Sequence, residues 1–274
     1  MDDLALLRYS RHILLPEIDV RGQECISQAH VLIVGAGGLG SPAALYLAAA
    51  GVGRLTLVDD DDVDLTNLQR QVLHSTSNIG RPKVHSAQAR LAEINPLVIV
   101  HALHSRLAEP QLSTLLQNNG ITLVLDCCDN FATRHAVNRA CVQAKVPLVS
   151  GAGIRFDGQI SVYDPRREDS PCYHCLFPED NAPEEVRCAV MGVFSPITGV
   201  IGTLQAMEAL KMIIGIGSPL VGRLLMLDGL GGEFNQIHFK RQTDCRVCGT
   251  DGTTRTPNTA AAPTATVTAT VTAR

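Results

Sequence analysis

The most informative part of the chain is the stretch VLIVGAGGLGSPAALYLAAAGVGRLTLVD, residues 31–59. An apolar run leads into a cluster of glycines that includes Gly38, a helical pattern follows, and a second apolar run ends at Asp59. Glycines between a strand and a helix allow a tight turn and bring backbone N–H groups close to a phosphate. The stretch therefore predicts a nucleotide site in which Asp59 accepts hydrogen bonds from ribose hydroxyls. It does not distinguish NAD from ATP.

Composition limits the classes of function. The chain has 274 residues, of which 45% are hydrophobic and 18% charged, so it can bury a full core. Its net charge of −4 gives no basic field for nucleic acid or acidic membranes. Arg8, Arg11 and His12 interrupt the apolar N-terminal residues, a pattern unlike a signal peptide. The apolar segment 198–217 is interrupted by polar residues at helical spacing and predicts a buried helix. We expect a cytoplasmic protein without nucleic-acid or membrane partners.

Strand and helix patterns alternate along the first part of the chain. This alternation predicts a doubly wound, Rossmann-like α/β fold with a parallel sheet. The expected buried strands are residues 31–35, 55–59, 98–103, 123–127 and 147–151. The expected helices are residues 41–50, 83–94, 110–117 and 132–144.

The pattern changes after Gly153. The segment GIRFDGQISVYDP predicts two strands joined at Asp157–Gly158, and residues 224–228 and 234–239 predict further antiparallel strands. Residues 1–249 are expected to form one domain. The Thr- and Ala-rich tail, residues 250–274, has little to bury and is expected to be disordered.

The residues after Asp59 favour ATP over NAD. A triphosphate carries more charge than a dinucleotide, and transfer of its α-phosphoryl group requires cations near the β- and γ-phosphates. Arg70 and Lys83 supply such cations in this interpretation, and Asn67 supplies a neutral donor. Each of the three residues is, taken alone, compatible with a solvated surface position.

The segment LDCCDN places Asp126, Asp129 and Asn130 at the end of a later strand, where open α/β sheets bind ligands. A carboxylate there can hold Mg²⁺ beside phosphate oxygens. Alternatively, Asp129 or Asn130 is the N-cap of the following helix. One of the two residues can cap the helix while the other binds the ligand.

Two Cys-x-x-Cys pairs predict a zinc site. CYHC contains Cys172 and Cys175, and CRVC contains Cys245 and Cys248. Four thiolates complete a tetrahedral zinc site and leave no open position, so we expect a structural metal that joins two distant segments. His174, inside the first pair, is an alternative ligand.

The other cysteines carry less information. Cys127, Cys128 and Cys141 fall in strand or helix patterns and are expected in the core. Cys188 lies in a loop-like stretch beside Arg187, which is typical of an activated nucleophile. An incidental, half-buried thiol explains Cys188 equally well.

Together these segments resemble the MoeB/ThiF/HesA family, relatives of the ubiquitin-activating enzymes. The segments that carry the resemblance are RYSRHILLPEID, GAGGLGSP, VDDDDVDLTNLQRQ, GRPK, DCCDN and the two Cys-x-x-Cys pairs, between Tyr9 and Gly249. The resemblance implies ATP-dependent adenylylation of the C-terminal glycine of a ubiquitin-like sulfur carrier of the MoaD or ThiS type. Pyrophosphate is released.

The resemblance also implies roles for individual residues. Arg11 matches an arginine that reaches the site of the other protomer, which implies a homodimer. Cys188 matches a loop cysteine that forms a sulfur linkage in ThiF-like members and is dispensable in MoeB-like ones. Asp129 matches the position of the magnesium ligand. The expected ATP-binding residues are Gly38, Asp59, Thr66, Asn67, Leu68, Gln69, Arg70, Lys83, Asp129 and Asn130.

The two branches of the family are not equally favoured. The segments VSGAGIRFDGQISVY and PLVGRLLMLDG resemble the MoeB branch of molybdenum cofactor biosynthesis, whereas RYSRHILL and VDDDDVDL resemble the ThiF branch of thiamine biosynthesis. We favour MoeB. Two hypotheses from other classes are an NAD-dependent oxidoreductase, which leaves Arg70 and Lys83 unused, and a noncatalytic zinc scaffold.

Overall fold

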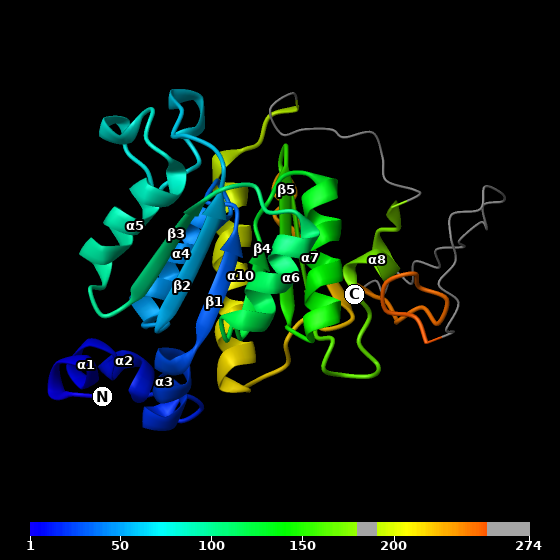
Figure 1. The fold of residues 1–274 in the computed structure, drawn as a ribbon, viewed down its shortest axis with the longest axis horizontal. Helices are drawn as coiled ribbons and strands as arrows, with labels where there is room; N and C mark the ends of the chain where they lie inside the picture. Colours follow the sequence, from blue (N-terminus) through cyan, green and yellow to red (C-terminus); the bar gives the residue numbers. More distant parts are fainter. Residues whose placement is uncertain (180–190, 251–274) are drawn as a thin grey trace.

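The computed structural model describes residues 1–179 and 191–250, which form a sheet between two layers of helices (Figure 1). The eight strands lie in the order β3-β2-β1-β4-β5-β6-β7-β8. β3, β2, β1, β4 and β5 pair in parallel, and β5 to β8 pair antiparallel. The strands are β1 His30–Val34, β2 Arg54–Asp59, β3 Ile99–His104, β4 Leu123–Asp126, β5 Leu148–Ile154, β6 Asp157–Tyr163, β7 Arg223–Asp228 and β8 Glu233–His238. This arrangement confirms the predicted parallel sheet that continues into antiparallel strands.

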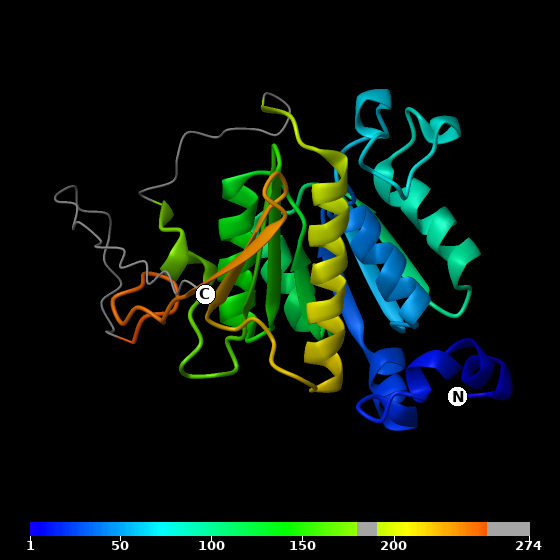
Figure 2. The same cartoon turned by 180° about the vertical axis from the view of Figure 1, so that it is seen from behind.

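The helices cover both faces of the sheet. α4, α5 and α10 pack on one face, seen at the front in Figure 2, and α6 and α7 pack on the other face, seen in Figure 1. The short N-terminal helices α1, α2 and α3 lie at the amino ends of the parallel strands (Figure 1). The helices are α1 Asp3–Arg8, α2 Ser10–Ile13, α3 Asp19–Gln28, α4 Gly40–Ala50, α5 Lys83–Ile94, α6 Glu109–Asn118, α7 Phe131–Ala144, α8 Tyr173–Leu176 and α10 Ser195–Ile214, with 3₁₀ turns η1 Leu65–Asn67 and η2 Thr76–Asn78.

Two hydrophobic clusters explain why the central strands are apolar throughout. Val31 and Ile33 of β1 face α4, α5 and α10, whereas Leu32 and Val34 face α6 and α7. Every residue of β1 is buried. A strand covered on both faces loses the polar alternation of a half-exposed strand, which is why the sequence shows continuous apolar runs.

The helix α10 was expected to be buried, and it runs along the middle of the sheet (Figure 2). Its Gln205 and Glu208 are 0% and 1% exposed. Gln205 donates to the carbonyl of Asp126 at 2.7 Å, and Glu208 accepts from Lys211 at 2.6 Å. Within the described residues α10 is the one helix long and apolar enough to cross a membrane, and here it packs against β-strands and α4.

The hairpin after Gly153 differs from the sequence prediction. The turn is Arg155–Phe156, and Asp157 already pairs with Ile154 as the first residue of β6. Arg155 takes a φ of +52° and is held there because its N–H donates to Gly192 and its carbonyl accepts from Phe194. The contact with residues 192–194 therefore overrides the Asp-Gly turn signal.

Candidate active site

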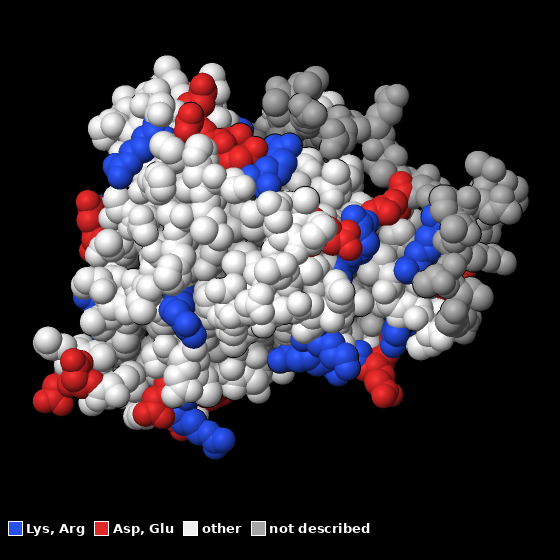
Figure 3. Space-filling view, viewed as in Figure 1, with Lys and Arg blue, Asp and Glu red and all other residues white. Residues whose placement is uncertain are grey.

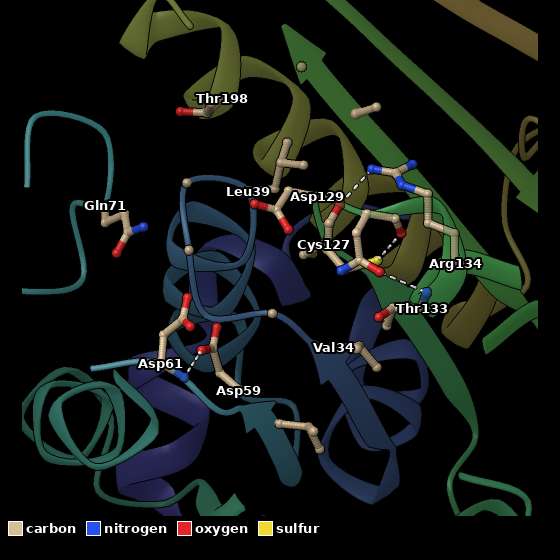
Figure 4. A pocket seen from close by; sticks show the side chains of 18 of the residues that line it. Val34, Leu39, Asp59, Asp61, Gln71, Cys127, Asp129, Thr133, Arg134 and Thr198 are labelled. Carbon is tan, nitrogen blue, oxygen red and sulfur yellow. Dashed lines mark hydrogen bonds between the residues drawn. The ribbon is translucent and has the colours of Figure 1, made fainter. Parts of the chain in front are cut away.

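A cavity of about 350 Å³ opens at the carboxyl ends of the parallel strands. The glycine turn after β1 forms its floor, and residues from the ends of β2 and β4, the start of α7 and the start of α10 form its walls. Figure 4 shows Asp59 and Asp61 on one side of the turn and Asp129 and Arg134 on the other. The predicted residues Gly38, Asp59, Arg70, Lys83, Asp129 and Asn130 all line this cavity.

The glycine turn is held by close backbone contacts. Gly35 has a φ of +96°, a conformation that costs other residues free energy. A Cβ at Gly40 would lie 1.9 Å from the carbonyl oxygen of Gly35. Only glycine fits at Gly40, and the turn therefore brings the N-terminus of α4 directly under the cavity.

Asp59 is oriented by the turn that it faces. Its Oδ2 accepts from the N–H of Ala36 at 2.7 Å, and its Oδ1 accepts from the N–H of Asp61 at 2.9 Å. Burial raises the pKa of the Asp59 carboxyl, and Lys83 opposes that shift. A carboxylate fixed in this way can accept hydrogen bonds from ribose hydroxyls.

The predicted cations Arg70 and Lys83 line the same cavity as Asp59. Lys83 is 4% exposed, and its Nζ pairs with Asp61 at 2.7 Å. The Nη2 of Arg70 donates to the Oδ1 of Asn67 at 2.6 Å, so Asn67 orients the guanidinium. Figure 3 shows acidic and basic side chains side by side along the top of the molecule, where the carboxyl ends of the parallel strands lie. Arg70 and Lys83 both line the cavity, so both can contact an anionic group bound there.

The structure separates the polar residues that follow β4. Asn130 caps α7, because its Oδ1 accepts from the N–H of Thr133 at 2.8 Å. Asp129 is exposed and lines the cavity without a cap contact. Its carboxylate has the hard oxygen ligands that Mg²⁺ requires, and it lies across the glycine turn from Asp59 (Figure 4).

Asp126 has a structural role instead. It is 1% exposed, and its Oδ2 accepts from Ser150 at 2.7 Å and pairs with Arg134 at 3.6 Å. Arg134 also donates to the carbonyls of Cys128 at 2.6 Å and Gly151 at 2.9 Å. These contacts fix the loop that carries Asp129. Cys127, Cys128 and Cys141 are buried, which confirms their expected place in the core.

Four residues that were predicted to bind the ligand do not line the cavity. Thr66, Asn67, Leu68 and Gln69 lie in and after η1, and they are absent from its walls. Within the described chain, Gln71 and Thr198 are lining residues that the sequence reasoning missed. Gln71 is adjacent to the predicted residue Arg70, and this position in the sequence could have identified it. Thr198 comes from α10, far along the chain, and no local sequence pattern indicated it.

The four cysteines of the two pairs meet beside α8. Their sulfur atoms all lie within 4.8 Å of one another. The distances are 4.0 Å from Cys172 to Cys175, 3.7 Å from Cys172 to Cys245 and 3.5 Å from Cys175 to Cys248. A tetrahedron with Zn–S bonds of about 2.3 Å has edges of about 3.8 Å. The thiols therefore fit a zinc ion.

Neighbouring groups support this cysteine cluster. Asn138 of α7 donates to the sulfur of Cys172 at 3.6 Å and accepts from the N–H of Tyr173 at 2.9 Å. The N–H of Gln242 donates to Cys175 at 3.5 Å. His174 is buried but lies outside the cluster of four, so the alternative of a histidine ligand is not supported.

Two predicted residues are not in the cavity of this chain as described. Arg11 is exposed on α2, at the amino ends of the strands and opposite the cavity (Figure 1). Cys188 lies outside the described residues, as does the predicted disordered tail beyond Thr250.

Comparisons with known proteins cover nearly the whole chain. Residues 9–247 match the model described as the ThiF family. The chain is 46% identical over 252 residues to a molybdopterin-synthase adenylyltransferase of Salmonella typhimurium, covering 91% of this chain and 98% of that protein. It is 46% identical over 249 residues to the sulfur carrier protein ThiS adenylyltransferase of Escherichia coli, covering 91% and 97%. An adenylyltransferase and sulfurtransferase of Mus musculus is 50% identical over 246 residues, covering 89% of this chain and 53% of that protein.

Solved structures share the fold. A crystal structure of Escherichia coli MccB with MccA-N7isoASN superposes with a TM-score of 0.76 at 24% identity, covering 88% of this chain and 74% of that chain. At this identity the likeness extends to the fold alone.

Proposed function

Because this chain belongs to the ThiF family, we propose that it is an adenylyltransferase that uses ATP to activate a ubiquitin-like sulfur carrier. The carboxylate of the carrier's C-terminal glycine attacks the α-phosphorus of ATP. The bond from the α-phosphorus to the bridging oxygen breaks, and pyrophosphate leaves with the electron pair. The product is an acyl-adenylate.

One observation supports this proposal most directly. Asp59, a carboxylate suited to accept hydrogen bonds from ribose hydroxyls, lines one cavity together with the cations Arg70 and Lys83. The exposed carboxylate of Asp129 lines the same cavity. An NAD-dependent oxidoreductase has no use for that combination, and a zinc scaffold has none for the cavity.

The chemistry follows from charge. An ionised carboxylate needs no general base, but it is repelled by the triphosphate, so the enzyme must hold both in line and neutralise charge. Arg70 and Lys83 carry positive charge at the cavity wall. Magnesium held by Asp129 would neutralise part of the remaining phosphate charge when bound. Asn130 and Arg134 keep the loop of Asp129 in place.

The carrier that we favour is of the MoaD type, in molybdenum cofactor biosynthesis. The segments VSGAGIRFDGQISVY and PLVGRLLMLDG motivate this choice. The alternative is a carrier of the ThiS type, because a ThiS adenylyltransferase and a molybdopterin-synthase adenylyltransferase are equally identical to this chain, at 46%.

We further propose a homodimer in which Arg11 reaches the partner's cavity. Arg11 lies at the end of the sheet opposite the cavity of its own chain (Figure 1). Large apolar side chains are exposed around it: Leu4 and Leu7 of α1 and Leu14 directly after α2, at 76%, 72% and 69%. An apolar patch of this kind is typical of a protein interface.

Zinc has a structural role in this proposal, because four thiolates leave no position for a substrate. Cys188 is not needed for acyl-adenylate formation, which uses only the carboxylate, ATP and cations.

ATP–pyrophosphate exchange with purified carriers tests the function. We expect exchange that depends on Mg²⁺ and on a MoaD-type carrier, and faster exchange than with a ThiS-type carrier. Faster exchange with ThiS would move the protein to the thiamine branch. Tight calorimetric binding of NAD without binding of ATP would refute adenylylation.

A further inference from the structure

His74 lies beside the glycine turn, is not among the residues that line the cavity, and makes two hydrogen bonds through its ring. It is 8% exposed. Its Nε2 lies 2.9 Å from the carbonyl oxygen of Ala36, and its Nδ1 lies 2.9 Å from the hydroxyl of Ser86 on α5. The ring therefore connects the glycine turn to the helix that carries Lys83.

The partners of the ring define its tautomer. A carbonyl oxygen can only accept, so Nε2 must carry the hydrogen. Burial lowers the pKa of His74, which keeps the ring neutral and leaves Nδ1 as an acceptor for the Ser86 hydroxyl. The Nε2–H form is thus the one that satisfies both contacts.

His74 binds the peptide group between Ala36 and Gly37, and Gly37 lines the cavity. In a planar trans peptide the carbonyl of Ala36 and the N–H of Gly37 point in opposite directions. With the carbonyl directed at His74, the N–H of Gly37 points away from the ring. Gly37 lines the cavity, and its N–H has no acceptor among residues 1–179 and 191–250.

Ala36 is held on both sides. Its N–H donates to Asp59 at 2.7 Å, and its carbonyl accepts from His74. The peptide between Ala36 and Gly37 is consequently fixed before any ligand binds, which is the condition for an effective oxyanion or phosphate contact.

We propose that His74 is a positioning residue for the nucleotide: by holding the carbonyl of Ala36 it directs the N–H of Gly37 at a phosphate of ATP. Ser86 occupies the unprotonated Nδ1 and connects the ring to α5, so that the Gly37 amide and Lys83 keep one relative position. This inference rests on the proposed function only for the identity of the ligand as ATP.

A pair of substitutions separates the two contacts of the ring. His74→Gln places an amide N–H near the position of Nε2 and can still donate to Ala36. His74→Asn places its amide near Nδ1 and reaches only Ser86. We expect His74→Asn to raise the calorimetric Kd for Mg²⁺-ATP by about tenfold, the factor equivalent to one net hydrogen bond. His74→Gln should stay within about threefold of the wild-type value.

Kinetics give a second readout. In pyrophosphate exchange the KM for ATP should rise in His74→Asn more than kcat falls, and His74→Gln should restore it. Equal ATP affinity in the wild type and His74→Asn would overturn the inference while leaving the proposed function intact. Absence of ATP binding by the wild-type protein would refute the proposed function itself.

Nuclear magnetic resonance of the wild-type protein tests the inference even if His74→Asn fails to fold. The ring nitrogens should report hydrogen on Nε2 and none on Nδ1 at neutral pH, and the Gly37 amide signal should move when Mg²⁺-ATP is added. An Nδ1–H ring, or a Gly37 amide that does not respond to bound ATP, would contradict the inference.

Discussion

At the scale of single residues, neighbours in sequence have separate roles. Asp126 ends β4, and Asp129 and Asn130 follow it, yet Asp126 is buried in an ion pair, Asp129 lines the cavity and Asn130 caps α7. The carboxylate of Asp126 is buried against Ser150 and Arg134, so the exposed Asp129 is the better candidate for metal binding.

We predict that Asp129→Ala abolishes exchange activity without unfolding the protein. Its side chain is exposed, so the loss of stability should stay within about 0.5 kcal/mol, whereas exchange should fall by at least about 100-fold. Asn130→Ala, which removes the cap, should instead cost about 1 kcal/mol. Exchange measurements and urea unfolding test both variants. Near-wild-type exchange in Asp129→Ala would rule out the metal role.

Buried histidines predict the pH dependence of stability. Burial lowers the pKa of both His30 and His74 below the unfolded value of about 6.5. Between the folded and the unfolded pKa the unfolded chain therefore binds more protons than the folded protein. The stability that the neutral, buried histidines contribute is present above the unfolded pKa and is lost as pH falls through the folded pKa. Urea unfolding between about pH 7.5 and about pH 5.5 should show this decrease. His74→Gln should reduce the slope, and an unchanged slope would contradict the assignment.

At the scale of elements, α10 is positioned by a close contact with the turn that leads into α4. A Cβ at Gly202 would lie 2.3 Å from the carbonyl oxygen of Leu39 and 2.6 Å from Pro42, whereas a Cβ at Gly199 would meet no atom of the described residues within 4 Å. The close contact allows Thr198 to reach the cavity.

These two glycines provide a matched pair. Gly202→Ala should destabilise the protein by about 1–3 kcal/mol, because backbone and proline must shift. Gly199→Ala, in the same helix, should be neutral or stabilising by up to about 1 kcal/mol. Thermal unfolding compares the two variants. Equal effects would show that helix propensity, and not the contact, dominates.

The cysteine cluster joins α8 to residues 245–248. Elemental analysis should find about one zinc ion per chain. Cys172→Ser should lower both the zinc content and the melting temperature, because loss of a ligand releases two distant segments. Cys25→Ser, a thiol outside the cluster, should change neither. A folded, active preparation without zinc would contradict this prediction.

At the scale of the whole molecule, the cavity and Arg11 lie at opposite ends of the sheet (Figure 1). A homodimer can complete each site with an arginine from the partner. Arg11→Ala and Asp129→Ala should each be inactive, and mixing them should restore activity. Because each mixed dimer contains one site with both residues intact, we expect recovery toward a quarter of wild-type exchange for random pairing. No recovery in dimers shown to have exchanged subunits would place Arg11 in its own chain's site or in a structural role.

Much of this fold could be read from local sequence. The helix expected at residues 83–94 is α5, Lys83–Ile94, and the expected central strands overlap β1 to β5. Continuous apolar runs, alternating with helical patterns, are sufficient for such assignments because burial on both faces imposes them residue by residue. The Cys-x-x-Cys pairs were equally readable, because metal coordination restricts both residue type and spacing.

The remaining features depend on contacts between distant segments. Residues 192–194 place the hairpin turn at Arg155, Arg134 makes Asp126 structural, and α10 brings Thr198 to the cavity. His74 reaches the glycine turn from a position 38 residues further along the chain. Local patterns record which residues can form a strand, a helix or a site. Which of them meet depends on the free energy of packing the whole chain, and no short window of sequence contains that information.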